Sequence, residues 1–288
     1  MIYAICNPTA GNGRGRTIGV QIEAALKGKK LPCRMLLTKA PGHATLLARQ
    51  ACAQGADTVL SIGGDGTALE VARGMLNAES ALGIIPAGTG NDFVKTLGVP
   101  KQPEQALEFI LSHPARKTDV GEINGRMFLN EIGTGFDVSV LDWAARAKRY
   151  CHGLLPYLYG VLQTLFRFRS VPITYSLDGG KSVTRDAFVV GVANGGMIGG
   201  GIPIAPEAKA DDGLLEVVVV DKIQSRHLIS RLIGLMQGKI LTFPETHYCR
   251  ASSVSFSTPN MRVNIDGEIV PEKEVVARVL PGALMIHR

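Results

Sequence analysis

Two glycine-rich segments carry aspartates at positions suited to phosphate chemistry. The first, GGDGT at 63–67, follows a strand-like run and precedes a helix-like one. Glycines in such a turn let backbone N–H groups close on a phosphate, and the following helix N-terminus adds favourable partial charge. Asp65 would repel a bare phosphate, so the segment implies Mg²⁺ bound together with a nucleotide. The alternative is an ordinary strand-to-helix turn in which Thr67 caps the helix.

Two further loops resemble the first in their setting. GTGND at 88–92 also follows a strand-like run, and alone it fits an ordinary loop with Asp92 as a helix cap. NPTAG at 7–11, followed by GRGR at 13–16, offers a loop friendly to anions. It lacks the Gly-Lys-Ser/Thr of a Walker loop and is not a convincing dinucleotide fingerprint. GGDGT and GTGND considered together make the ordinary-loop interpretation less favourable, because both follow neighbouring strands.

Strand-like and helix-like segments alternate through the first 120 residues, and these elements must position the loops. Such alternation predicts a parallel sheet covered by helices, with ligands at the carboxyl ends of the strands. The expected strands are 2–6, 33–37, 58–62 and 82–85, and the expected helices are 17–26, 43–54 and about 68–77.

Short strands dominate from residue 120 onward. Segments 120–123 and 127–132 flank Asn124-Gly125 and predict a hairpin. Two helical stretches, 142–169 and 225–237, interrupt the pattern. We therefore expect a second, largely antiparallel β domain. The other expected strands are 173–177, 187–193, 214–220, 254–257, 262–265 and 275–280.

Asp266-Gly267-Glu268 lies late in the chain between two apolar runs. An Asp-Gly pair in this setting most often forms a hairpin turn. The residues alone therefore favour a turn, and a chemical role for Asp266 needs support from elsewhere.

The segment 143–177 contains no Asp or Glu, and basic residues flank its apolar middle. One interpretation is a core helix with solvated ends. The other is an interfacial helix whose cations meet anionic lipid while its apolar body guides a lipid. The basic residues are Arg146, Lys148, Arg149, Arg167 and Arg169.

Composition narrows the classes of protein that the chain can be. The chain has 288 residues, is 45% hydrophobic and has a formal net charge of +6, which suits a folded protein with anionic partners. Five widely spaced cysteines without a C-x-x-C pair argue against a disulfide framework or a zinc site. The run 154–166 is too short and too interrupted to span a membrane, and the first residues do not resemble a signal peptide. We therefore expect a cytoplasmic protein.

The combination of GGDGT, GTGND and NPTAG resembles the soluble bacterial diacylglycerol kinase and lipid kinase family, which is related to sphingosine and ceramide kinases. The resemblance extends to FLN at 128–130, 133–137, 194–206 and the DDG and DGE segments at 211–213 and 266–268, so it covers nearly the whole chain. It implies an α/β nucleotide-binding domain like those of NAD kinase and phosphofructokinase at 1–120. It also implies a mainly antiparallel β-sandwich domain that binds lipid at 121–277, with a tail of about 278–288 that can return to the first domain.

The resemblance also assigns residues to ATP and metal ions. Asp65, Asp92 and Asp119 would hold the catalytic Mg²⁺ through water. Asp212 and the carbonyl of Leu214 match a structural metal site, at which Asp211 can replace a ligand lost because Lys209 stands upstream. The residues that the resemblance assigns to ATP are Asn7, Pro8, Thr9, Ala10, Gly11, Thr38, Gly64, Asp65, Gly66, Thr67, Ala68, Leu69, Glu70 and Thr89.

By the same resemblance, Asp266 acts as general base on the lipid hydroxyl and Glu268 supports it. A carboxylate near the acceptor oxygen takes its proton as the phosphoryl group arrives. One departure from the family is Leu69, at a position that is often Asn, which removes a polar contact near the nucleotide.

The function expected is therefore transfer of the γ-phosphoryl group of Mg-ATP to a lipid hydroxyl, with diacylglycerol as the default. Phosphatidylglycerol or a sphingoid or ceramide-like lipid are alternatives, and NAD kinase or a non-catalytic lipid-binding protein fit less well. The expected partners are a lipid at the inner face of the membrane, bound peripherally, and no nucleic acid, since only 6% of residues are aromatic. A homodimer is compatible with the sequence.

Overall fold

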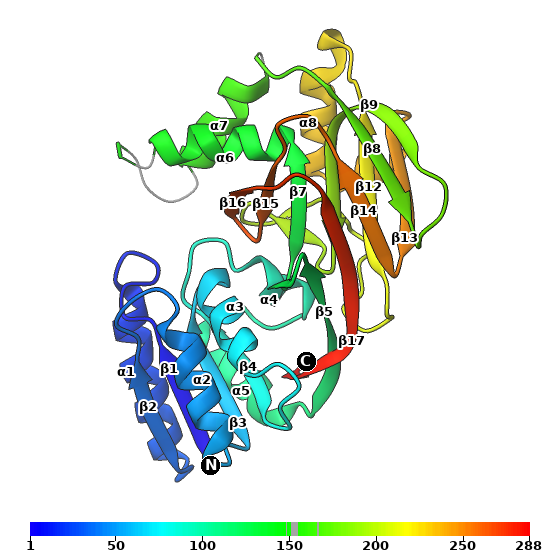
Figure 1. Cartoon of the computed structure of the whole chain (residues 1–288). Coiled ribbons are helices and arrows are strands. Elements are labelled where there is room, and N and C mark those ends of the chain that lie inside the picture. Colours follow the sequence, from blue (N-terminus) through cyan, green and yellow to red (C-terminus); the bar gives the residue numbers. More distant parts are fainter. Residues whose placement is uncertain (148, 151–154, 166) are drawn as a thin grey trace. The chain divides into compact units, whose positions relative to one another are not determined.

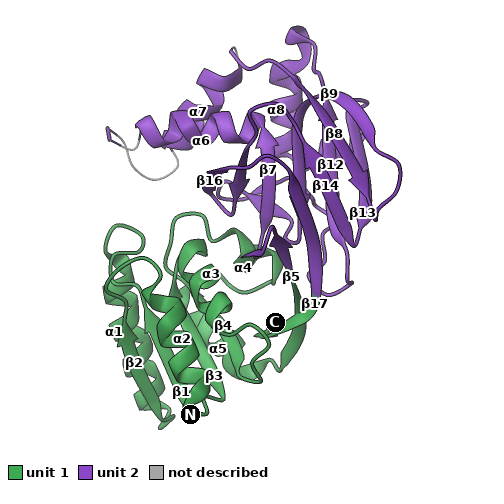
Figure 2. Ribbon diagram, in the orientation of Figure 1, with its two compact units in different colours: residues 1–120, 281–288 green, residues 121–280 purple. Residues whose placement is uncertain are grey.

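The computed structural model describes residues 1–147, 149–150, 155–165 and 167–288. The chain forms two compact units (Figures 1 and 2). Unit 1 contains Met1–Val120 and Pro281–Arg288, and unit 2 contains Gly121–Leu280. Strands β5 (Ala115–Ile123) and β17 (Val275–His287) contain the boundaries, so the chain passes between the units twice within extended backbone.

Unit 1 is a parallel sheet with helices between its strands, as the alternation predicted. The strands run in the order β2-β1-β3-β4, and the end of β17 adds a further parallel strand beside β4 through Met285 and Ile286. Every residue of β4 is buried, as expected for a central strand of a parallel sheet. The strands are β1 (Ile2–Cys6), β2 (Cys33–Leu37), β3 (Thr58–Gly63) and β4 (Ala81–Pro86).

The helices of unit 1 pack in pairs, α1 with α5 and α2 with α3. The pair α2 and α3 approaches closely at Gly74, where an added Cβ would lie 2.4 Å from the carbonyl oxygen of Thr45. Two of the helices, α4 and α5, were not predicted from the sequence. The helices are α1 (Arg14–Gly28), α2 (His43–Ala53), α3 (Asp65–Gly74), α4 (Asp92–Thr96) and α5 (Pro103–Ser112).

Unit 2 is built from antiparallel strands, and the predicted fold class is confirmed. Strand β9 is central: it pairs with β12 on one edge and with β7 and β8 on the other, and β12 also pairs with β13. Beyond β7 come β15 and β16, while β14 links β8 to β17. The strands are β6 (Arg126–Phe128), β7 (Glu131–Gly135), β8 (Val171–Leu177), β9 (Val183–Ala193), β12 (Leu215–Asp221), β13 (Thr246–Ala251), β14 (Ser253–Ser257), β15 (Arg262–Ile265) and β16 (Glu268–Pro271), with β10 (Met197–Ile198) and β11 (Ile202–Pro203) as a separate pair.

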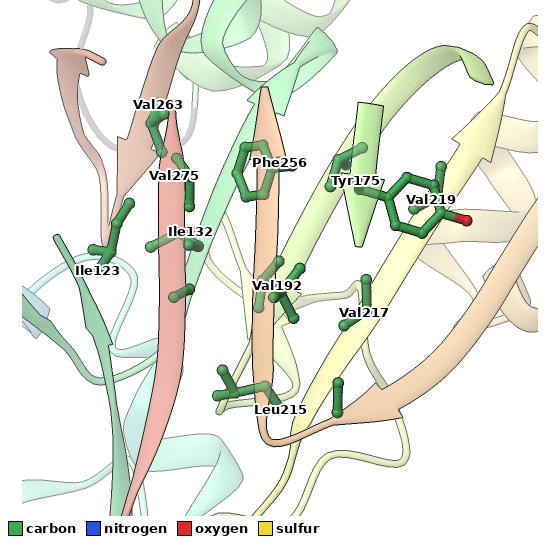
Figure 3. Packing of buried hydrophobic residues seen from close by; sticks show 14 of the residues in the cluster. Ile123, Ile132, Tyr175, Val192, Leu215, Val217, Val219, Phe256, Val263 and Val275 are labelled. Carbon is green, nitrogen blue, oxygen red and sulfur yellow. The ribbon is translucent and has the colours of Figure 1, made fainter. Parts of the chain in front are cut away.

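The core of unit 2 is a cluster of buried apolar side chains donated by many of these strands (Figure 3). Ile132 of β7, Val192 of β9, Val217 of β12 and Phe256 of β14 are each at most 1% exposed. Alternate residues of each strand reach this core, which explains why short strands with period-two hydrophobicity were recognisable in the sequence.

Two predictions for unit 2 need correction. The expected single strand 127–132 is two strands, β6 and β7, separated at Leu129 and Asn130. The expected long helix 142–169 is two helices, α6 (Phe136–Ala147) and α7 (Leu155–Leu165), which pack on each other. Part of that predicted helix lies outside the described residues.

The remaining helical elements of unit 2 follow β12. A 3₁₀ turn, η1 (Ser225–His227), leads into α8 (Leu228–Met236), and η2 (Ile240–Thr242) precedes β13. None of the helices described is both long enough and apolar enough to span a bilayer.

Candidate functional site

Unit 1 contains a pocket of about 450 Å³ at the carboxyl ends of its parallel strands. Three loops that follow β1, β3 and β4 meet there. The sequence led us to expect that the loops after β3 and β4 lie together, because both follow neighbouring strands. Ten of the residues assigned to ATP line the pocket. The lining residues are Asn7, Pro8, Thr9, Ala10, Gly11, Thr38, Lys39, Ala40, Pro41, Ala44, Gly64, Gly66, Thr67, Glu70 and Gly88.

The other residues assigned to ATP lie outside this lining. Ala68 and Leu69 are buried in the core of unit 1, at 2% and 7% exposure, and Thr89 is exposed on its loop. Leu69, at the position where the family resemblance implies Asn, is therefore part of the buried core. Asp65 lies beside the pocket, in the acidic pair described below.

Close backbone contacts shape the pocket, and glycine is needed for them. Gly11 has φ +58°, and an added Cβ would lie 2.2 Å from the carbonyl oxygen of Ala87. A Cβ on Gly88 would lie 2.5 Å from the Cα of Gly64. The three loops therefore touch one another through backbone, which leaves their N–H groups close to whatever occupies the pocket.

Side chains attach the loop that follows β1 to the N-terminus of α3. Asn7 Nδ2 donates to Thr67 Oγ1 at 3.1 Å, and Asn7 Oδ1 accepts from the backbone N–H of Thr9 at 3.1 Å. No side chain caps α3, whose N-cap residue is Gly64, so Thr67 is not the helix cap that the sequence allowed. An uncapped helix N-terminus facing a pocket is a favourable place for a phosphate.

Two aspartates, Asp65 and Asp92, come together beside the pocket. Asp65 Oδ1 accepts from the backbone N–H groups of Asp92 at 2.7 Å and Phe93 at 3.3 Å. A Cβ built on Gly90 would lie 3.1 Å from Asp65 Oδ2 and 3.4 Å from Asp92 Oδ2, so these two oxygens face one point. Lys95 Nζ lies 2.8 Å from Asp92 Oδ1 and neutralises one of the two charges.

Burial and the nearby Asp92 carboxylate raise the pKa of Asp65, and the backbone N–H donors lower it in part. A cation would relieve the repulsion between these two carboxylates. Its donor set fits Mg²⁺, which keeps several waters and takes one or two carboxylates together with phosphate oxygens.

The third predicted member of this acidic group, Asp119, lies in β5. It is buried, and its Oδ1 accepts from the backbone N–H of Gly282 at 2.7 Å. Among the residues that the structure describes, no three His, Cys, Asp or Glu side chains are grouped to bind a metal ion.

The predicted structural metal site is an exposed turn in this structure. Asp211 and Asp212 are both exposed, and Asp212 Oδ1 accepts from the backbone N–H of Leu214 at 3.1 Å. This hydrogen bond stabilises the turn, and a metal ion at this turn stays a prediction.

In unit 2, Asp266 forms a hairpin turn and also anchors a distant loop. Asp266 and Gly267 have φ +47° and +94° and connect β15 to β16, as the Asp-Gly pair predicted. The Asp266 carboxylate accepts from three backbone N–H groups of the segment between β6 and β7. The donors are Leu129 at 2.7 Å, Asn130 at 2.9 Å and Glu131 at 2.9 Å. Glu268, expected to support Asp266, is exposed at the start of β16.

A buried polar cluster surrounds this anchor, and sequence analysis did not identify its members. Glu131 and Asn264 are each 5% exposed, and Asn264 Nδ2 donates to Glu131 Oε1 at 3.0 Å. Both carboxylate oxygens of Asp137 are buried, and this burial raises the pKa of Asp137 to about 6. For Glu131 and Asn264 the available signal was a polar residue inside an otherwise apolar strand.

Asn194 completes the support of the loop between β6 and β7. Its Nδ2 donates to the Leu129 carbonyl at 2.8 Å, and its backbone N–H donates to the Asn130 carbonyl at 2.9 Å. Leu129 and Asn130 are therefore held from two sides, by Asp266 and by Asn194. This double attachment explains why the expected strand 127–132 is interrupted.

Family models match both parts of the chain. The diacylglycerol kinase catalytic domain matches residues 1–123, and the YegS C-terminal NAD kinase beta sandwich-like domain matches residues 130–288. A diacylglycerol kinase of Mycobacterium tuberculosis is 30% identical over all of this chain and 94% of its own length. A Pseudomonas aeruginosa protein named "Probable lipid kinase YegS-like" is 32% identical over 96% of this chain and 90% of its own.

Solved structures agree with these matches. A diacylglycerol kinase from Bacillus anthracis aligns with a TM-score of 0.73 and 25% identity, over 99% of this chain and 95% of its own. An NAD kinase from Archaeoglobus fulgidus, with a TM-score of 0.54, is 15% identical over 100% of this chain and 94% of its own. The second similarity concerns the fold alone.

Proposed function

Because the chain belongs to the diacylglycerol kinase family of lipid kinases, we propose that it transfers the γ-phosphoryl group of Mg-ATP to the hydroxyl of diacylglycerol. The observation that carries this proposal is the pocket of unit 1, where three glycine-containing loops meet next to the paired carboxylates of Asp65 and Asp92. Phosphoryl transfer is catalysed mainly by positioning and by charge stabilisation, and these are what such loops and carboxylates supply.

The triphosphate of ATP would lie against the uncapped N-terminus of α3, with Asn7 and Thr67 fixing the loop beside it. Asp65 and Asp92 would hold Mg²⁺ through water, and Asp119 is proposed as a third member on the family resemblance alone. Mg²⁺ supplies neutralisation of the charge on the phosphate oxygens. Lys95 holds Asp92 in place by its ion pair.

Asp266 is proposed as the general base. It would accept the proton of the lipid hydroxyl while that oxygen bonds to the γ-phosphorus and the bond to the bridging oxygen of ADP breaks. Three backbone N–H donors fix the orientation of the carboxylate. The buried side chains of Glu131 and Asn264 stiffen the loop that supplies those donors.

We further propose peripheral binding at the inner face of the membrane through α6, α7 and the basic residues around them. On α7, Leu155, Leu158, Tyr159 and Leu162 are exposed at the spacing of one helix face, while the opposite face is buried. Arg146 and Arg167 both lie over the ring of Trp143, and Arg149 and Arg169 are also exposed. Lys148 and Leu154, part of the predicted segment, lie outside the described residues.

Neutralising Arg146, Lys148 and Arg149 together tests this membrane contact. Binding to anionic vesicles should weaken, most strongly at low salt where screening is least, and activity on a short-chain soluble diacylglycerol should be retained. Vesicle binding that does not depend on these charges would favour the core-helix interpretation of this segment.

Phosphate transfer from Mg-ATP to a panel of acceptors tests the function itself. The panel should contain diacylglycerol, phosphatidylglycerol, a sphingoid base and ceramide in mixed micelles, together with soluble NAD. Phosphatidic acid formed from diacylglycerol is the expected product. Transfer to another lipid alone would replace the acceptor, and transfer to NAD alone would overturn the proposal.

A further inference from the structure

Helix α8 of unit 2 presents large apolar side chains to solvent. Ile229, Ile233 and Met236 are 58%, 52% and 64% exposed. Their spacing of four and then three residues places them in one stripe on the helix. In Figure 1 the helix lies at the edge of unit 2, outside its strands.

The rest of α8 is attached firmly to unit 2. Gly234 is buried, and a Cβ added to it would lie 2.8 Å from the ring of Phe243. Leu235 packs against the second apolar cluster of this unit, which includes Ile240 and Phe243. The helix therefore packs on unit 2 through one face, and its stripe of Ile229, Ile233 and Met236 is exposed to solvent.

Single exposed apolar residues are common on protein surfaces, but a row of three on one helix face indicates a binding surface. Val20 of α1 and Leu46 of α2 illustrate the ordinary case, because each is the single large apolar residue that is exposed on its helix. They provide a comparison for the stripe on α8.

The charge around the stripe identifies its partner. Residues 222–244 contain no Asp or Glu and four basic residues. Lys222, Arg226 and Lys239 are exposed, whereas Arg231 is paired with Glu245. A second copy of α8 packed on the same face would bring like charges together, but an anionic bilayer offers apolar chains beneath a layer of negative phosphates.

We propose that α8 is a membrane-insertion helix. Ile229, Ile233 and Met236 enter the acyl-chain boundary of an anionic bilayer, while Lys222 and Arg226 contact the phosphate headgroups. This inference deepens the proposed function, on which it rests for its biological setting, because a lipid kinase must reach a substrate that resides in the bilayer. It adds an element separate from α6 and α7.

Binding to vesicles without nucleotide or diacylglycerol tests the helix directly. The variant Ile229→Ser/Ile233→Ser/Met236→Ser should bind vesicles of phosphatidylglycerol and phosphatidylcholine about 100-fold more weakly than the unchanged protein, since three apolar side chains lose their burial. The control Val20→Ser/Leu46→Ser removes exposed apolar surface elsewhere and should bind as the unchanged protein does. Circular dichroism and thermal unfolding show that both variants fold.

A second variant tests the charges independently of the apolar stripe. Lys222→Gln/Arg226→Gln should weaken binding to the same anionic vesicles, and the loss should shrink as salt is raised. Its binding to pure phosphatidylcholine vesicles should not change. The two variants together keep the test informative if the triple variant folds poorly.

Two results would overturn the inference. The first is unchanged vesicle binding by the folded triple variant or, should that variant not fold, by the charge variant. The second is a dimer in sedimentation that the serine substitutions convert to monomer, which would assign the stripe to a second copy of the chain. Failure of the kinase assay on every lipid, with vesicle binding still dependent on α8, would instead refute the proposed function and leave the membrane helix standing.

Discussion

Replacing Asp266 by Asn should lower the stability of the folded protein and slow the reaction. The carboxylate receives N–H groups from Leu129 on one oxygen and from Asn130 and Glu131 on the other. An amide keeps one accepting oxygen and puts an NH₂ group where the other oxygen was. At least one backbone N–H then faces a donor, even though Asn-Gly suits the turn as well as Asp-Gly does.

The size of the stability loss follows from that unpaired group. A buried donor left without a partner costs about 1–3 kcal/mol. For a unit of this size 1 kcal/mol shifts the melting temperature by about 2–4 °C, so Asp266→Asn should lower it by roughly 2–12 °C. Differential scanning calorimetry measures this shift. An unchanged melting temperature would refute the anchoring role that the hydrogen bonds indicate.

The catalytic effect is measured separately, well below the melting temperature of the variant. Loss of a positioned general base should lower lipid phosphorylation by roughly 10²–10⁴-fold, with ATP binding retained. Asn264→Ala serves as the matched control, because it removes the acceptor of the Gly267 N–H from the same hairpin and leaves the Asp266 carboxylate. Near-normal turnover by Asp266→Asn, or an equal loss in Asn264→Ala, would return Asp266 to a structural role.

Three further predictions concern other carboxylates. Asp65→Asn keeps an acceptor for the Asp92 N–H and should lose activity with little change in stability. Asp65→Ala should also destabilise the protein by about 1 kcal/mol, because that acceptor is lost. Activity in a folded Asp65→Asn protein would contradict the metal role. The pKa of Asp137 is raised from 3.8 to about 6, so its ionisation should lower the free energy of unfolding by about 2 kcal/mol as pH rises from 4 to 6, and Asp137→Asn should flatten that slope in urea titrations. If Asp212 binds a structural metal ion, a chelator should lower the melting temperature of the unchanged protein but not of Asp212→Ala; identical melting with and without chelator would dismiss the metal.

The sequence predicted the fold class and most strands because hydrophobic periodicity reports directly on burial. It missed α4 and α5 for different reasons. Helix α4 has only five residues and begins inside the GTGND loop, where glycines conceal it. Helix α5 carried a usable signal, since Pro103 and Glu104 occupy its first turn and suit a helix start.

Predicted boundaries were wrong where local pattern and long-range contact disagree. The apolar residues between 142 and 169 suggested one helix, but an apolar pattern does not mark the end of α6 or the start of α7. The strand expected at 127–132 is interrupted because Asp266, more than 130 residues away, binds the backbone of Leu129 and Asn130. No periodicity within the segment can reveal that contact.

The glycine-rich loops of the pocket were recognisable because so many glycines within a few residues are an unusual local composition. The hydrogen-bond and packing partners of individual side chains were not recognisable from the sequence. That Asp65 Oδ1 is held by the N–H groups of Asp92 and Phe93 depends on how two loops meet, and that Leu69 packs into the core depends on the rotation of α3. Residue type and spacing identify candidates, while the fold decides which atoms each candidate offers.

Asp65 and Asp266 belong to different units, yet they are held in the same way. In each case backbone N–H groups of a neighbouring segment hold the carboxylate, so the fold sets its direction. Carboxylates fixed in this way would need no reorganisation during the proposed reaction. If both carboxylates act in that reaction, the same attachment couples their chemistry to stability. A substitution at either one must therefore be judged by its effect on folding before its effect on rate has a meaning.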